Sequence, residues 1–281
     1  MKVQHIAAFS VGNEGGNPAG VVFLENPALE VAMKRVAAKV GYSETVFASP
    51  NDGTGKSWRV RYFSPESEVP FCGHATVALG AALGQRNGPG TYKLELNEAS
   101  ITVEAQDTDR GMVATLLSPP TFSRMATAAE TNDLLALFDF HEDDIDDRLP
   151  PARIHAGAEH IVLGLKDRAV LGGMEYDLDQ GRSLMRQHGI VTIMLVYVEE
   201  NRNFSVRNAF ASGGVLEDPA TGAAAAAFAG YLRDLGWDHG GQFTILQGDD
   251  MGVPSVIEVG LTNVPGSSIR ISGRARDITN F

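Results

Sequence analysis

Cysteine and basic residues are both scarce in this chain. Cys72 is the only cysteine among 281 residues, so an intramolecular disulfide is excluded. The 23 Lys and Arg are outnumbered by 35 Asp and Glu, which gives a formal net charge of −12. This is the wrong sign for binding phosphate backbones or anionic membrane surfaces. The composition therefore predicts neither a nucleic-acid nor a membrane partner.

Long hydrophobic runs are also missing. None approaches the roughly 20 apolar residues that cross a bilayer, and the run from Ala223 to Ala229 is far too short. Mean hydropathy is −0.08 with 43% hydrophobic residues, as in soluble globular proteins. Residues 1–7 lack the basic start and apolar core of a secretion signal. We therefore expect a cytoplasmic protein.

The familiar cofactor and nucleophile motifs do not occur. There is no Gly-x-Ser-x-Gly elbow, and no glycine fingerprint for a dinucleotide follows a predicted strand. Residues 53–57 end like a phosphate-binding loop, but residues 58–63 alternate like a strand, so 51–56 is predicted to be a hairpin turn. Cys72 and His74 lack two further partners at metal-ligand spacing. The sequence predicts no cofactor and no metal.

Two stretches of the chain do resemble each other. Residues 71–76 (FCGHAT) lead into a run of small apolar residues, and residues 218–222 (DPATG) lead into another. A helix that is apolar on every side is buried all round. Its N-terminus presents unpaired backbone N–H groups that suit an anion such as a carboxylate. The pattern predicts two half-sites that face one cleft.

The similarity extends beyond these stretches to a duplication. When Cys72 is aligned with Pro219, the predicted helix at Leu29 falls near Leu178 and the strand at Trp58 falls on Ser205. A mostly antiparallel sheet that encloses an apolar helix must curl around it. The sequence therefore predicts an α+β fold of two similar domains, each a mixed β-barrel around a central helix. We expect them over residues 1–120 and 121–281, with the last strand able to return to the first domain.

Three polar residues stand near the predicted helix starts. His74 and Asp218 each lie at the mouth of one of the paired helices, and Glu44 begins the strand after a helix that ends at Gly41. Each also has an ordinary structural interpretation. Asp218 would be a helix N-cap before Pro219, Glu44 an exposed carboxylate at a strand end, and His74 a first-turn polar residue.

Five segments together resemble the phenazine biosynthesis PhzF-like family. They are residues 16–21 (GNPAGV), 41–47 (GYSETVF), 71–76 (FCGHAT), 217–222 (EDPATG) and 247–255 (QGDDMGVPS). The resemblance implies a diaminopimelate epimerase-like fold with the active site between two domains. It also implies a homodimer and a cofactor-independent isomerase that moves a proton between carbons of a small carboxylated amino or hydroxy acid.

The resemblance also implies roles for individual positions. Glu44 falls on the general acid/base glutamate of the family, His74 on its active-site histidine and Asp218 on its acidic partner. Substrate contacts are expected at the helix starts, namely at Gly73, Thr221, Gly222 and Ala223. Two positions depart from the family pattern, since Ala223 replaces a serine and Val253 replaces an arginine. Both changes make the site less polar and suggest a substrate other than the phenazine precursor.

Two alternatives stay open. The scaffold without catalysis would be a small-molecule-binding or partner-binding protein, an interpretation that Ala223 and Val253 favour. A racemase or epimerase would need a second base, and related enzymes use two cysteines. Here the position that matches Cys72 is Pro219, so the second base cannot be a thiol. Cys72 is then expected to be a small buried residue rather than a nucleophile.

Overall fold

The computed structural model describes residues 1–97, 99–200 and 202–278, which fold into two compact units. Unit 1 contains residues 1–117 together with the C-terminal residues from 272 on, and unit 2 contains residues 118–271. Among the described residues, no helix is long and apolar enough to cross a membrane. Each unit is built around one of the two helices of small residues.

The described residues of unit 1 form a closed barrel of eight strands. Neighbouring strands follow the order β1, β2, β3, β4, β6, β7, β8 and β16, and β16 pairs back onto β1 in the antiparallel sense. The short β5 (Glu68–Val69) pairs with β4. The barrel strands are β1 (Gln4–Ala8), β2 (Asn17–Phe23), β3 (Glu44–Pro50), β4 (Ser57–Phe63), β6 (Gly90–Glu95), β7 (Ser100–Thr108), β8 (Gly111–Leu117) and β16 (Arg270–Asp277).

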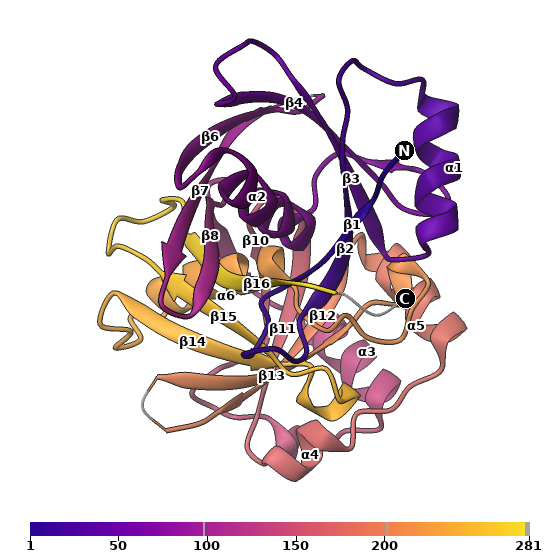
Figure 1. The fold of residues 1–281 in the computed structure, drawn as a ribbon. Coiled ribbons are helices and arrows are strands. Elements are labelled where there is room, and N and C mark those ends of the chain that lie inside the picture. Colours follow the sequence, from indigo (N-terminus) through magenta and orange to yellow (C-terminus); the bar gives the residue numbers. More distant parts are fainter. Residues whose placement is uncertain (98, 201, 279–281) are drawn as a thin grey trace. The chain divides into compact units, whose positions relative to one another are not determined.

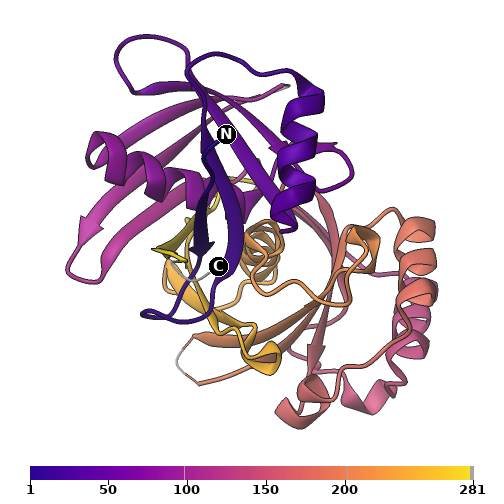
Figure 2. The same cartoon turned by 45° about the vertical axis from the view of Figure 1, so that its right-hand side comes forward.

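The helix α2 (Gly73–Asn87) runs through this barrel between β7 and β8 on one side and β1 and β2 on the other (Figure 1). Every residue from 73 to 84 is buried, as predicted from the all-round apolar pattern. The hydroxyl groups of Tyr62 and Thr76 lie 2.7 Å apart and tie the helix to β4. The helix α1 (Glu30–Val40) lies on the outside of the barrel strands (Figure 2). Its Met33 and Ala37 pack against Phe47 and Phe63.

In the part of unit 2 that the structure describes, seven strands follow the order β9, β10, β11, β12, β13, β14 and β15. The helix α6 (Gly222–Asp234) contacts β9 and β10 at one end of this order and β15 at the other, so the sheet curls around the helix. Phe228 of α6 packs edge-on against Phe204. The strands are β9 (Phe122–Met125), β10 (Ala152–His155), β11 (Glu159–Leu165), β12 (Thr192–Val198), β13 (Asn203–Ala209), β14 (Gln242–Gln247) and β15 (Ser255–Gly260).

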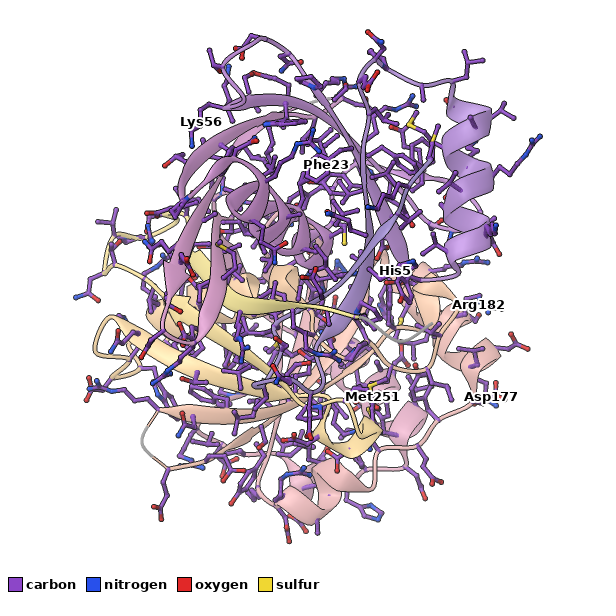
Figure 3. All side chains as sticks on the ribbon, in the orientation of Figure 1. His5, Phe23, Lys56, Asp177, Arg182 and Met251 are labelled. Carbon is purple, nitrogen blue, oxygen red and sulfur yellow. The ribbon has the colours of Figure 1, made fainter. Side chains whose placement is uncertain are left out.

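The outer face of the unit 2 sheet is covered by three helices: α3 (Ala128–Phe138), α4 (Arg168–Gly172) and α5 (Leu178–His188). Asp177 caps α5 by accepting hydrogen bonds from the N–H groups of Asp179 and Gln180. Asp177 and Arg182 point outward from this helix (Figure 3). Three short 3₁₀ helices, η1 (Glu142–Asp144), η2 (Ala211–Gly213) and η3 (Asp249–Met251), lie in the connections.

The strands of the two units are connected and paired in the same order. In unit 1, β2 and β3 pair in parallel across α1, β3 and β4 pair antiparallel, and β4 and β6 pair in parallel across α2. In unit 2, β11, β12, β13 and β14 pair in the same senses, with α5 and α6 in the place of α1 and α2. The predicted fold class, two similar barrel-like units around central helices, is confirmed.

The imidazole of His160 is buried inside unit 2, and burial disfavours its protonated form. Its imidazole is 1% exposed, and Nδ1 lies 2.7 Å from Oγ1 of Thr192, while Nε2 has no hydrogen-bond partner among the described residues. Burial lowers the pKa of His160 from its ordinary 6.5 to about 3. The folded protein therefore holds this imidazole neutral at pH values where the unfolded chain protonates it.

This difference predicts a pH-dependent stability. Between pH 6.5 and about 3 the unfolded chain binds one more proton at residue 160 than the folded chain. The free energy of unfolding therefore falls as the pH falls, by up to about 1.4 kcal/mol per pH unit for this group. We expect His160→Gln to reduce the stability difference between pH 7 and pH 5 in urea unfolding. The exposed His141→Gln should leave it unchanged, and equal effects of the two substitutions would contradict the assignment.

Candidate active site

Two chain segments bring Glu44 and His74 together in unit 1. The helix α1 ends at Gly41, whose φ of 75° lies in the left-handed region, and β3 begins at Glu44. Val46 and Ala48 share a strand face with Glu44, and the alternate Phe47 packs toward α1. Glu44 therefore faces the interior, where α2 begins at Gly73 and carries His74 in its first turn.

The imidazole of His74 is held from both sides. Its Nε2 lies 3.5 Å from Oε2 of Glu44 and 3.4 Å from Oγ of Ser43. Its Nδ1 lies 3.3 Å from Sγ of Cys72. The side chains of His74 and Glu44 are only 6% and 13% exposed. A carboxylate and an imidazole in contact, largely shielded from water, are placed to exchange protons with a bound molecule.

The N-terminus of α2 adds hydrogen-bond donors to this group. Cys72 is the N-cap residue but does not cap the helix through its side chain, and its carbonyl accepts from the N–H of Thr76. The N–H groups of the first turn, which include those of Gly73 and His74, have no acceptor within the helix. They suit an anionic oxygen, as the sequence predicted for Gly73.

In unit 2, Asp218 is held by a hydrogen-bond network rather than acting as an N-cap. The helix α6 begins at Gly222 with Thr221 as the N-cap residue, so the interpretation of Asp218 as the cap is wrong. The carboxylate of Asp218 accepts a hydrogen bond from the hydroxyl of Thr221. Its backbone N–H donates to the carbonyl of Asn208 over 3.0 Å, and Nε2 of Gln247 donates to its carbonyl over 2.6 Å. Asp218 is 7% exposed.

The other positions predicted in unit 2 lie beside Asp218. Gly222 and Ala223 are the first two residues of α6, and Ala223 is half-buried. The turn at Gly248 has a φ of 80°, and a Cβ there would lie 2.9 Å from the carbonyl oxygen of Pro219 and 2.5 Å from that of Val253. The C-terminal motif 247–255 is therefore packed against the motif 217–222.

Sequence reasoning gave no role to Ser43 or Gln247 and set Cys72 aside, although all three belong to these clusters. The expectation that Cys72 is a small buried residue rather than a nucleophile stays a prediction; the structure places its sulfur 3.3 Å from Nδ1 of His74. Its position two residues before His74 at a helix start was the available signal. The sequence analysis considered only Cys72 and His74 as metal donors. The structure adds Glu44, because these three residues offer ligand atoms within 4.8 Å of one another.

The acid/base pair is not repeated in unit 2. Strand register matches Glu44, which pairs with Ala19, to Thr192, which pairs with His160. The second residue of the central helix is His74 in α2 and Ala223 in α6. Unit 2 therefore has neither a carboxylate nor an imidazole at the two positions that carry them in unit 1.

Comparison with known proteins assigns the chain to a family. The family described as "Phenazine biosynthesis-like protein" matches residues 6–279. An uncharacterized isomerase of Deinococcus radiodurans is 34% identical over 90% of this chain and 84% of its own length. The trans-2,3-dihydro-3-hydroxyanthranilate isomerase of Pseudomonas chlororaphis is 30% identical over 90% of this chain and 87% of its own.

Solved structures agree on the fold. A PhzF-family phenazine biosynthesis protein of Bacillus anthracis superposes with a TM-score of 0.87 at 23% identity, covering 100% of this chain and 99% of the other. A probable proline racemase of Agrobacterium radiobacter superposes with a TM-score of 0.66 at 12% identity, covering 98% and 90%. The chain belongs to the phenazine biosynthesis-like family with the epimerase-like fold, and the prediction of an isomerase is confirmed.

Proposed function

We propose that this isomerase moves a proton between carbons of a small carboxylated amino or hydroxy acid, without a cofactor. The observation that carries the proposal is the shielded contact between Glu44 and His74 at the first turn of α2. The substrate class is supported by the Pseudomonas chlororaphis relative, whose named substrate is a cyclic amino acid with a hydroxyl group.

In the proposed mechanism Glu44 is both base and acid. Its carboxylate removes a proton from one substrate carbon, and the electron pair of that C–H bond shifts into the adjacent unsaturated system. The resulting carboxylic acid then returns the proton to another carbon, so the protein ends in its starting state. No electrons leave the substrate, and hence no redox group is needed. His74 would orient the Glu44 carboxylate through Nε2, 3.5 Å away.

The half-site of unit 2 is proposed to take part in the same reaction. Asp218 is the candidate acidic partner, and the first-turn N–H groups at Gly222 and Ala223 are candidate donors to the substrate carboxylate. Glu217, which precedes Asp218, accepts from Arg207 over 2.6 Å, and Arg207 also donates to the carbonyl of Gly172 over 2.8 Å. This buried ion pair would fix the loop that carries Asp218.

A racemase with two matched bases is less well supported. Such an enzyme needs an acid/base group on each side of the substrate, and the positions that match Glu44 and His74 carry Thr192 and Ala223 in unit 2. One acid/base residue that takes a proton from one carbon and delivers a proton to another fits an isomerase that changes a single substrate molecule.

Deuterium incorporation tests the proposal. We expect the protein in D₂O to label a carbon of at least one member of a panel of cyclic amino and hydroxy acids, as detected by NMR, because the acid formed at Glu44 exchanges with solvent. Chiral analysis of the products would reveal a racemase instead. Binding to panel members with neither label nor conversion in any of them would support a binding protein and contradict the proposed isomerisation.

A further inference from the structure

The proposed reaction uses only two of the three side chains that meet at Glu44, Cys72 and His74. Proton transfer requires the carboxylate and the imidazole, but it does not require the thiol. A thiol, an imidazole and a carboxylate are nevertheless the three side-chain types that bind zinc in proteins. Here their ligand atoms all lie within 4.8 Å of one another.

We propose that Glu44, Cys72 and His74 form a Zn²⁺ site, and that zinc bound there inhibits the isomerase. Bound zinc occupies the carboxylate and the imidazole on which proton transfer depends. The binding is independent of the enzymatic mechanism, whereas the inhibition rests on the proposed function of Glu44 and His74.

Each of the two donors beside His74 lies at a distance from its own ring nitrogen that a tetrahedral zinc site allows. Zinc bonds to sulfur, nitrogen and oxygen of about 2.3, 2.0 and 2.1 Å separate the donor atoms by about 3.3–3.6 Å. Sγ of Cys72 already lies 3.3 Å from Nδ1 of His74. Oε2 of Glu44 lies on the other side of the ring, 3.5 Å from Nε2. A zinc ion at one ring nitrogen therefore requires the donor on the opposite side of the ring to move closer from a separation of up to 4.8 Å, through rotation of the Glu44 or Cys72 side chain.

Charge and ligand type favour zinc over the hard cations. A thiolate and a carboxylate supply two negative charges, so the complex with Zn²⁺ and a neutral imidazole is neutral and its burial costs little. Thiolate and imidazole are softer ligands than Mg²⁺ or Ca²⁺ prefer. Three protein ligands leave a fourth position for water or another oxygen, as in zinc sites that stay open.

The single cysteine makes the binding directly measurable. Cys72 is the only thiol in the chain, so its rate of alkylation by iodoacetamide reports on this site alone. We expect saturating ZnCl₂ to slow alkylation of the full-length protein by about tenfold or more, because the thiolate is then a metal ligand. Co²⁺ in place of zinc should give the absorption of a cobalt–thiolate bond, at one ion per chain.

Matched variants separate this site from weak surface binding. Cys72→Ala and Glu44→Gln should each weaken zinc binding by about tenfold or more, as measured by calorimetry. His155→Ala, which removes a half-buried imidazole 2.7 Å from Glu159, should leave it unchanged. If Cys72→Ala does not fold by circular dichroism, Cys72→Ser in the cobalt experiment takes its place, and the cobalt–thiolate absorption should be lost.

Two results would overturn the site: unchanged alkylation at saturating zinc, or wild-type affinity in the Cys72 variant. Either leaves the proposed reaction intact. If zinc binds at Cys72 but turnover is unaffected, inhibition is refuted and Glu44 and His74 lose their place in the mechanism. Inhibition that follows the binding curve and is reversed by EDTA supports both proposals.

Discussion

Glu44→Gln is expected to lower kcat by about 10²–10⁴-fold, the usual contribution of a positioned general acid or base. Glutamine has the shape of glutamate but cannot take up or return the proton. The Glu44 side chain is 13% exposed and contacts His74, so the amide can keep a hydrogen bond to Nε2 and preserve the fold. The measurement is turnover and deuterium incorporation with a substrate identified in the D₂O panel.

The matched control for this substitution is Glu95→Gln. Glu95 also lies at the end of a strand, but it pairs on the surface with Lys93 at 2.5 Å. We expect wild-type turnover from it and an unchanged melting temperature for both variants. In the same assay His74→Gln and Asp218→Asn should reduce turnover while deuterium labelling stays detectable. Full activity of Glu44→Gln would remove Glu44 from the mechanism.

Gly80→Ala is expected to destabilise unit 1, although alanine is the better helix former. In an open helix this change stabilises by up to about 1 kcal/mol. At residue 80, however, a Cβ would lie 2.5 Å from Cγ2 of Val103 and 3.0 Å from Cβ of Ala114, both fully buried. Overpacking of this kind costs about 1–3 kcal/mol. This cost exceeds the gain in helix propensity, so the substitution lowers the free energy of unfolding. Urea or thermal unfolding measures the effect.

Two further variants show that the clash is the cause. Gly53→Ala lies in the turn between β3 and β4, where a Cβ would meet no atom within 4 Å, and it should change stability by less than about 0.5 kcal/mol. Val103→Ala removes the clashing methyl groups, so the double variant with Gly80→Ala should be more stable than the sum of the single effects. A stabilising Gly80→Ala would show that the barrel can expand around α2.

Much of the fold was predictable from local pattern. The helix predicted at Leu29 is α1 (Glu30–Val40), and the position near Leu178 on which it falls in the duplication begins α5 (Leu178–His188). Residues 51–56 form the turn between the antiparallel strands β3 and β4, as predicted. These predictions succeeded because helix and strand periodicity and turn residues are properties of consecutive residues.

Other features depend on contacts between distant segments. Ser43 and Cys72 approach His74 from both sides of its ring, and Gln247 holds the backbone on both sides of Pro219. The third metal donor, Glu44, is on another strand than Cys72, so no spacing rule along the chain includes it. Asp218 was interpreted as an N-cap because it precedes proline. In the structure α6 begins at Gly222, and Asp218 instead accepts a hydrogen bond from the hydroxyl of Thr221 in the turn before the helix.

The sequence by itself determined the duplication, the two enclosed helices and the absence of a second thiol, because composition and periodicity need no tertiary contact. Only the tertiary structure decided that the carboxylate of Glu44 and the sulfur of Cys72 meet the imidazole of His74. The reason is strand register. Periodicity predicts that Glu44 faces the interior of the barrel. The parallel pairing of β3 with β2, which places Glu44 opposite Ala19, determines that Glu44 lies at the end of the barrel where α2 begins.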